Sequence, residues 1–116
     1  MKGRNNMYEL DHKHTATVTI GRSIGNEPMD ADRWQEFIRE LGIIVRTRGL
    51  RVYTYKAIGT GHWADSRGEF VTEESCTYVY ELEEAAAGIT ASLLHDLAMK
   101  YEQDSIALVL GQTIFC

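Results

Sequence analysis

A strict alternation of apolar and polar residues near the start of the chain limits the fold more than any other feature. From Thr15 to Ile20 the chain reads Thr-Ala-Thr-Val-Thr-Ile, so every second side chain is apolar. A period of two is typical of a β-strand that buries one face, and β-branched residues favour such a strand. Gly21 ends the pattern. This segment therefore predicts a half-buried strand.

A helical pattern follows a short loop over residues 22–28. Asp30 suits the N-cap position, because its carboxylate can accept hydrogen bonds from the free amides of a first helical turn. Apolar residues then recur at intervals of three or four, at Trp34, Phe37, Ile38, Leu41 and Val45. The spacing predicts a helix to about Arg46, and Gly42 leaves open a helix that stops there.

The rest of the chain repeats the strand and helix patterns. Alternating segments predict strands over residues 51–58, 76–82 and 105–110. A later apolar stripe predicts a second helix, which could start within Ala85–Ala87 or be capped by Thr90. Between the second and third strands, the glycine-containing segment Gly59–Ser75 is interpreted as a long irregular loop. Loops of this length are often functional, so this segment is the first place to look for a site.

The order strand-helix-strand, strand-helix-strand is that of the ferredoxin-like fold. It predicts an α+β sandwich in which two helices cover one face of a four-stranded antiparallel sheet. We expect residues 1–13 to form a flexible leader and residues 14–116 to form a single domain. The open face of the sheet needs a cover, which favours a homodimer over a monomer.

Composition excludes several classes of function. Acidic residues outnumber basic ones by 17 to 12, and the basic residues form no run, which argues against binding duplex nucleic acid. No apolar stretch is long enough for a membrane helix, and the first residues lack the apolar core of a signal peptide, so we expect a cytoplasmic protein. The two cysteines have no metal-like spacing, and we expect neither a metal nor a cofactor.

The expected loop holds the first candidate site, in the run Gly59-Thr60-Gly61-His62-Trp63. Gly59 and Gly61 would let the backbone approach a ligand closely. His62 could donate to a phosphate, and Trp63 could stack on a base or another ring. The run matches no phosphate-binding motif, and a loop whose tryptophan folds back onto the core explains it as well.

Two further groups of residues are candidates for ligand binding. Tyr53 and Tyr55 would lie across a hairpin from Tyr78 and Tyr80, where the rings could make an aromatic platform or could simply be half-buried strand residues. Arg22 follows the first strand and could bind a phosphate or carboxylate. Other arginines cluster near the end of the first helix, where the helix dipole alone favours cations.

Four groups of short strings stand out along the chain. They are Thr17-Val18-Thr19-Ile20-Gly21-Arg22, Pro28-Met29 with Trp34 and Phe37, Gly61-His62-Trp63 with Glu74-Ser75, and Ser105-Ile106-Ala107-Leu108 with Gly111-Gln112-Thr113. In these strings the chain resembles small bacteriophage-encoded proteins of uncharacterised function. The resemblance spans residues 15–113. It implies a phage or prophage origin, the host cytoplasm as the location, and an accessory role, and it assigns no catalytic residue.

The leading interpretation from the sequence is a non-enzymatic binding protein. It would serve in phage counter-defence, either by blocking a host protein or by sequestering a small nucleotide-like ligand. One alternative is a small-pocket enzyme with His62 as acid or base, assisted by a tyrosine or Glu74. Another is a virion or assembly protein held by contacts between sheet edges.

Overall fold

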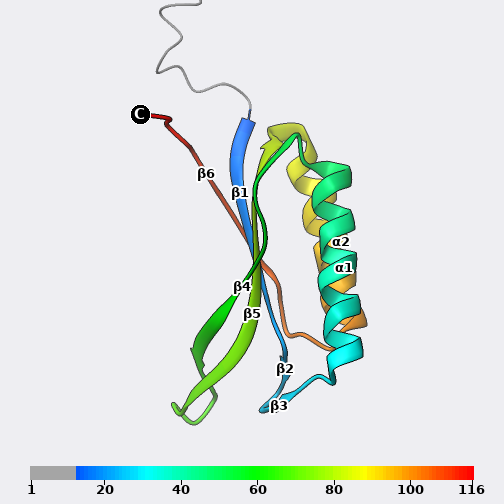
Figure 1. Cartoon of the computed structure of the whole chain (residues 1–116), viewed down its shortest axis with the longest axis vertical. Helices are drawn as coiled ribbons and strands as arrows, with labels where there is room; N and C mark the ends of the chain where they lie inside the picture. Colours follow the sequence, from blue (N-terminus) through cyan, green and yellow to red (C-terminus); the bar gives the residue numbers. More distant parts are fainter. Residues whose placement is uncertain (1–12) are drawn as a thin grey trace, which may run out of the picture.

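Four strands of the computed structural model, which describes residues 13–116, form one antiparallel sheet in the order β4-β5-β1-β6. The strands are β1 (Lys13–Gly21), β4 (Arg51–Ala64), β5 (Phe70–Glu83) and β6 (Ala107–Gly111). Both helices lie on one side of this sheet, and no helix formed by residues 13–116 lies on the other side (Figure 1). The predicted ferredoxin-like arrangement is confirmed. The predicted leader lies outside the described residues except for Lys13, which begins β1.

Helix α1 (Ala31–Arg48) begins where the sequence predicts. The Asp30 carboxylate accepts a 2.8 Å hydrogen bond from the backbone amide of Arg33, which caps the helix. The helix continues through Gly42, because the glycine lies directly over Tyr78: a Cβ atom there would be 2.9 Å from the tyrosine hydroxyl. Gly42 therefore permits close packing of α1 on the sheet.

Helix α2 (Ala87–Lys100) begins at the earlier of the two expected positions. A short 3₁₀ turn, η2 (Glu84–Ala86), leads directly from β5 into it. Thr90 lies inside the helix and is fully buried, and its hydroxyl donates a 2.7 Å hydrogen bond to the carbonyl of Ala86. Thr90 is therefore not the cap of α2, the other expected possibility, and its hydroxyl bonds to the preceding turn of its own helix.

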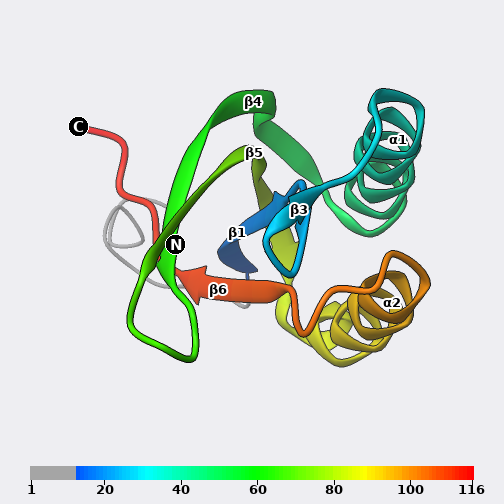
Figure 2. The same cartoon turned by 90° about the horizontal axis from the view of Figure 1, so that it is seen from below.

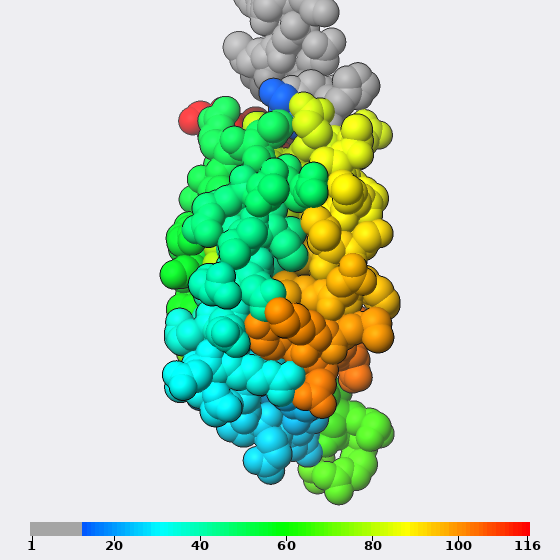
Figure 3. Space-filling model, turned by 90° about the vertical axis from the view of Figure 1, so that its right-hand side faces the viewer, coloured from blue at the N-terminus to red at the C-terminus, as the bar shows by residue number. Residues whose placement is uncertain are grey.

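The core fills the space between the helices and the inner face of the sheet. β1 contributes its aliphatic residues at alternate positions, as its pattern predicts, and α1 contributes its apolar stripe. The fully buried residues of the sheet and of α1 are Ala16, Val18, Cys76, Tyr78, Tyr80, Leu82, Phe37, Leu41 and Val45. From the helix side, α1 and α2 lie next to each other (Figure 3).

The prediction that Gly59–Ser75 forms a long irregular loop is wrong. Most of it extends β4 and β5 into a hairpin, with Gly59 paired to Ser75 and Ala64 paired to Phe70. Only five residues, Asp65 to Glu69, form the connection, where Gly68 adopts a φ of 81°. The hairpin reaches beyond the helices (Figure 1) and arches across the open side of the sheet toward β6 (Figure 2).

The expected loop after β1 contains a second, smaller hairpin. Its strands are β2 (Ser23–Ile24) and β3 (Glu27–Pro28), and Gly25 turns between them with a φ of 62°. Backbone hydrogen bonds of 2.9 Å tie Arg22 to Glu74 of β5 and to Met29. This small hairpin therefore has a fixed place beside the end of the long one. Within residues 13–116, neither helix is long and apolar enough to cross a membrane.

Candidate functional site

Two adjoining hollows lie where the long hairpin meets the β2–β3 turn and the segment between α2 and β6. Their volumes are about 280 and 320 Å³, and they share Gly25, Trp63 and Asp104. We call the pair the Trp63 groove. Its other lining residues are Ser23, Asn26, Asp65, Ser66, Arg67, Glu73, Glu102, Gln103 and Ser105.

Glu73 forms one wall of the groove and is held by backbone. Its Oε2 accepts a 2.7 Å hydrogen bond from the amide of Ser23. Gly21 makes room for this carboxylate, because a Cβ atom there would overlap it. The next residue, Glu74, points to the other side of β5 and accepts 3.0 Å hydrogen bonds from Arg22 and Trp34. The two adjacent glutamates therefore fix the β2–β3 hairpin from opposite sides.

The segment after α2 forms a second wall. Glu102 ends the helix with a φ of 56°, and the backbone amide of Gln103 donates a 2.8 Å hydrogen bond to the carbonyl of Ala98. The Gln103 side chain donates a 3.1 Å hydrogen bond to the Ser23 carbonyl, which joins this wall to β2. Glu102 forms an ion pair with Arg33 at 3.0 Å. Asp104 makes no hydrogen bond or ion pair with any described residue.

The turn of the long hairpin closes the far end of the groove. Asp65 Oδ1 accepts hydrogen bonds of 2.9 and 3.0 Å from the amides of Arg67 and Glu69. The amide of Gly68 donates 2.9 Å to the carbonyl of Asp65, which completes a tight turn. Arg67 thus projects from a rigid backbone although its side chain is 71% exposed.

The groove combines an aromatic surface with an excess of negative charge. Trp63 is 37% exposed, so part of its ring is open to a ligand. Four carboxylates line the groove, from Asp65, Glu73, Glu102 and Asp104, against the single guanidinium of Arg67. Such a site suits a ligand with an aromatic ring and a positive charge, because rings stack and opposite charges attract at close range.

The run Gly59–Trp63, the first candidate site of the sequence analysis, lies entirely in β4, so its side chains point alternately to the two faces of that strand. Trp63 lies in the groove, and Gly59 and Gly61 lie on the same strand opposite Ser75 and Glu73. His62 points the other way, since neighbouring strand residues alternate. Its Nδ1 is 3.1 Å from the hydroxyl of Thr72, and no carboxylate in residues 13–116 bonds to it.

The tyrosines do not form one platform. Tyr78 is fully buried and donates a 3.1 Å hydrogen bond to the carbonyl of Ile38, so it is unavailable to a surface ligand. Burial raises its pKa. Tyr55 packs edge-on against Tyr78 with ring centroids 5.2 Å apart, and Tyr53 packs edge-on against Phe115 at 5.8 Å. None of the three tyrosines lines the Trp63 groove.

Arg22, a predicted ligand-binding residue, is engaged within the protein. Its Nε donates 2.8 Å to the carbonyl of Met29, and its Nη1 pairs with Glu74. The groove residues that the sequence analysis missed come from the β2–β3 hairpin at 23–26, from the turn at 65–67, from Glu73, and from the segment at 102–105. The acidic residues that follow the second helical pattern, Glu102 and Asp104, were the one available signal.

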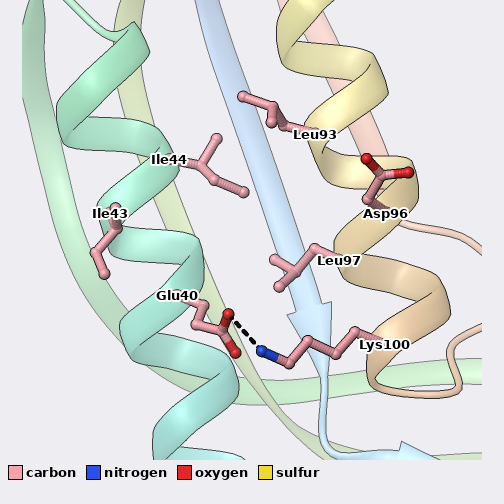
Figure 4. Close-up of a pocket in the computed structure, with 7 residues that line it drawn as sticks. All are labelled: Glu40, Ile43, Ile44, Leu93, Asp96, Leu97 and Lys100. Carbon is pink, nitrogen blue, oxygen red and sulfur yellow. Dashed lines mark hydrogen bonds and ion pairs between the residues drawn. The ribbon is translucent and has the colours of Figure 1, made fainter.

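A further hollow of about 250 Å³ lies between α1 and α2 on the outer surface (Figure 4). Its walls are aliphatic, from Ile43, Ile44, Leu93 and Leu97. Lys100 closes one end with a 2.9 Å ion pair to Glu40. The hollow has fewer polar groups that could orient a ligand than the Trp63 groove has. Among residues 13–116, no group of three potential ligands could hold a metal ion.

Comparison with known proteins finds likeness at the level of structure. No family model and no curated protein matches the chain. A solved structure of a phage SAM lyase in complex with S-methyl-5'-thioadenosine aligns over 91% of this chain and 85% of its own, with a TM-score of 0.67 and 17% sequence identity. A phage SAM lyase in the apo state aligns over 93% and 96%, with a TM-score of 0.59 and 14% identity.

These structures correct the functional interpretation drawn from the sequence. A non-enzymatic binding protein was expected, but both of these structurally similar proteins are SAM lyases, which are enzymes. They also come from phages, which agrees with the source of the proteins that the sequence resembles.

Proposed function

We propose that this protein is an enzyme that cleaves S-adenosylmethionine (SAM) and releases S-methyl-5'-thioadenosine. The observation that carries the proposal is the fold shared over 91% of the chain with a phage SAM lyase bound to that thioether. At 17% identity this likeness supports the fold alone. The Trp63 groove supplies independent support, because its chemistry matches that of the substrate.

SAM combines a flat adenine ring with a sulfonium cation and an ammonium group. The exposed part of Trp63 offers a surface on which adenine can stack, and stacking of a base on an aromatic side chain contributes about 1–3 kcal/mol. The carboxylates of Glu73 and Asp104 supply the negative potential that attracts the two cationic groups. Glu73 is fixed by its bond to the Ser23 amide, so this potential has a defined position.

The reaction needs little from the protein beyond orientation. The sulfonium sulfur already carries the positive charge of a good leaving group and departs with the electron pair of its bond to Cγ as a neutral thioether. Either the substrate's own carboxylate oxygen takes its place at Cγ, giving a lactone, or a base removes a Cβ proton, giving a C=C bond. A groove that holds the methionine chain in a reactive geometry lowers the entropic part of either barrier.

Incubation of the purified full chain with SAM tests the proposal. Mass spectrometry should show SAM loss and equimolar S-methyl-5'-thioadenosine, faster than in a heat-denatured sample that measures spontaneous decay. Proton NMR of the four-carbon product distinguishes the lactone from the alkene. A titration with SAM, followed by tryptophan fluorescence, gives the SAM concentration that saturates the protein. SAM loss no faster than in the denatured sample at that concentration, or no binding at all, would contradict the proposal.

A role in phage counter-defence follows from this activity. An enzyme that consumes SAM in the host cytoplasm would deprive host methyl-transferring and SAM-dependent defence proteins of their substrate. The proposal replaces sequestration of a nucleotide-like ligand by its destruction. Expression in a bacterial host should lower cellular SAM, measured by mass spectrometry, and should reduce methylation of host DNA.

Self-association as a homodimer is part of the proposal. β6 is an edge strand without a charged residue, and such edges pair readily with other chains. Val109 on this strand is 60% exposed, and Ile114 and Phe115 after it are 65% and 71% exposed. Light scattering coupled to size exclusion should report twice the chain mass, and a monomer at micromolar concentration would contradict the homodimer.

A further inference from the structure

Among the described residues that line the Trp63 groove, Arg67 is the one cationic residue. It projects from the turn that joins β4 to β5, four residues after Trp63. The other charged lining residues are carboxylates. One hollow of the groove is lined by Glu73 and Glu102, the other by Arg67 and Asp65, and Trp63 and Asp104 border both.

The guanidinium of Arg67 is only loosely engaged within the protein. Its Nη2 lies 3.4 Å from Glu69 Oε2 and 3.9 Å from Asp65 Oδ2, and the guanidinium makes no ion pair with any other described residue. Asp65 uses Oδ1 to hold two backbone amides, so the turn keeps its shape without the arginine side chain. Exposed ion pairs of this kind contribute little to stability. Arg67 can therefore exchange them for a ligand at small cost.

We infer that Arg67 binds the α-carboxylate of the methionine part of SAM and so selects for ligands that carry the complete amino acid. This inference rests on the proposed function and deepens it. A guanidinium binds a carboxylate through two parallel hydrogen bonds, which adds geometric selectivity to charge attraction. The hollow without Arg67 does not suit this carboxylate, because the like charges of Glu73 and Glu102 repel it and none of its described lining residues is a lysine or arginine.

The inference separates two ligands that share the adenosine part. S-adenosylhomocysteine has the amino-acid carboxylate and lacks the reactive sulfonium, so it is not cleaved. S-methyl-5'-thioadenosine lacks the amino acid altogether. If Arg67 holds the carboxylate, removal of its side chain weakens binding of the first ligand and leaves binding of the second unchanged.

Isothermal titration of the full chain with both ligands tests the inference. Arg67→Ala should weaken the binding of S-adenosylhomocysteine about tenfold or more, the loss expected for a charged bidentate contact. The affinity for S-methyl-5'-thioadenosine should stay unchanged. Arg67→Lys, which keeps the charge without the fork, should fall between Arg67→Ala and the unaltered chain. Arg39→Ala is the matched control, because it removes an exposed arginine from α1 outside the groove.

Three results overturn the inference. If Arg67→Ala weakened the binding of both ligands equally, Arg67 would instead shape the turn, and circular dichroism melts would show the accompanying loss of stability. Unchanged binding of both ligands would leave the carboxylate to another residue. Failure of the unaltered chain to bind either ligand, together with failure to cleave SAM, would remove the proposed function itself, whereas the first two results leave it standing.

Discussion

The indole Nε1 of Trp34 donates a 3.0 Å hydrogen bond to Glu74 Oε2, and this contact joins the first turn of α1 to β5. Trp34 is 1% exposed, so its N–H has no access to water and depends on this partner. The other carboxylate oxygen accepts from Arg22, which also holds the carbonyl of Met29. Glu74 thus connects the small hairpin, the long hairpin and α1, next to the wall that Glu73 gives to the groove.

Replacement of Glu74 by alanine should lower the free energy of unfolding by about 1–2 kcal/mol, because it leaves the Trp34 N–H buried without an acceptor. This is the lower part of the range of about 1–3 kcal/mol for a buried group left without a partner, because the Glu74 side chain is 39% exposed. Urea unfolding followed by tryptophan fluorescence measures the change. Glu74→Gln should lose less, since an amide oxygen can still accept. The exposed Glu27→Ala serves as control, and equal stability of Glu74→Ala and Glu27→Ala would contradict the assignment.

Two buried tyrosines on β5 should respond in opposite ways to the loss of a hydroxyl. Tyr78→Phe removes the 3.1 Å hydrogen bond to Ile38 and should lower the free energy of unfolding by about 0.5–1.5 kcal/mol. The Tyr80 hydroxyl is buried and has no hydrogen-bond partner among the described residues, so Tyr80→Phe should leave stability unchanged or raise it. Thermal melts of both variants check the order, and a larger loss in Tyr80→Phe than in Tyr78→Phe would contradict it.

Glu40 links the stability of the helix pair to pH. Burial alone would raise its pKa, but hydrogen bonds from Tyr101 and Lys100 and the charges of Lys100 and Arg39 outweigh burial and hold the pKa below 4.5. A carboxyl whose pKa is lowered by folding stabilises the protein above its unfolded pKa, and this stabilisation is lost as the pH falls through the folded value. Glu40→Gln should therefore be less stable than the unaltered chain at pH 7.

The difference between Glu40→Gln and the unaltered chain should shrink steadily below pH 4.5 and vanish once the carboxyl is protonated in both states. Chemical unfolding at a series of pH values measures it. A difference that is constant from pH 7 to pH 3 would assign the role of Glu40 to packing instead of charge.

The pattern of the sequence was sufficient to predict the fold because its main signals are local. The alternation from Thr15 to Ile20 became β1, and Asp30 became the cap of α1. The segment Gly59–Ser75 was misassigned because Gly59 and Gly61 are loop signals in isolation. In the folded chain they pair with Ser75 and Glu73, and cross-strand pairing outweighs the weak propensity of single residues.

The site was harder to predict because its residues lie far apart in the sequence. Trp63 was identified, but Glu73 and Asp104 meet it only through the arch of the hairpin and the end of α2. Lys56 adopts a φ of 55° near two irregularities in the pairing of β4 with β5, and such irregularities bend strands and increase their twist. The local sequence around Lys56 contains no signal for this bend. The periodicity of the sequence therefore could not predict which residues meet in the groove.

Trp63 and His62 are adjacent residues on opposite faces of β4, so their replacement separates the Trp63 groove from the histidine-based enzyme considered at the outset. Trp63→Ala should raise the KM for SAM by about ten- to a hundredfold, the effect of losing stacking worth about 1–3 kcal/mol. Trp63→Phe, which keeps a ring, should recover most of the affinity. His62→Ala should change kcat and KM little, because its described contact is with Thr72 on the far side of the hairpin. Steady-state rates of S-methyl-5'-thioadenosine formation measure all three variants. Loss of kcat in His62→Ala with normal kinetics in Trp63→Ala would move the active site to the other face of the hairpin.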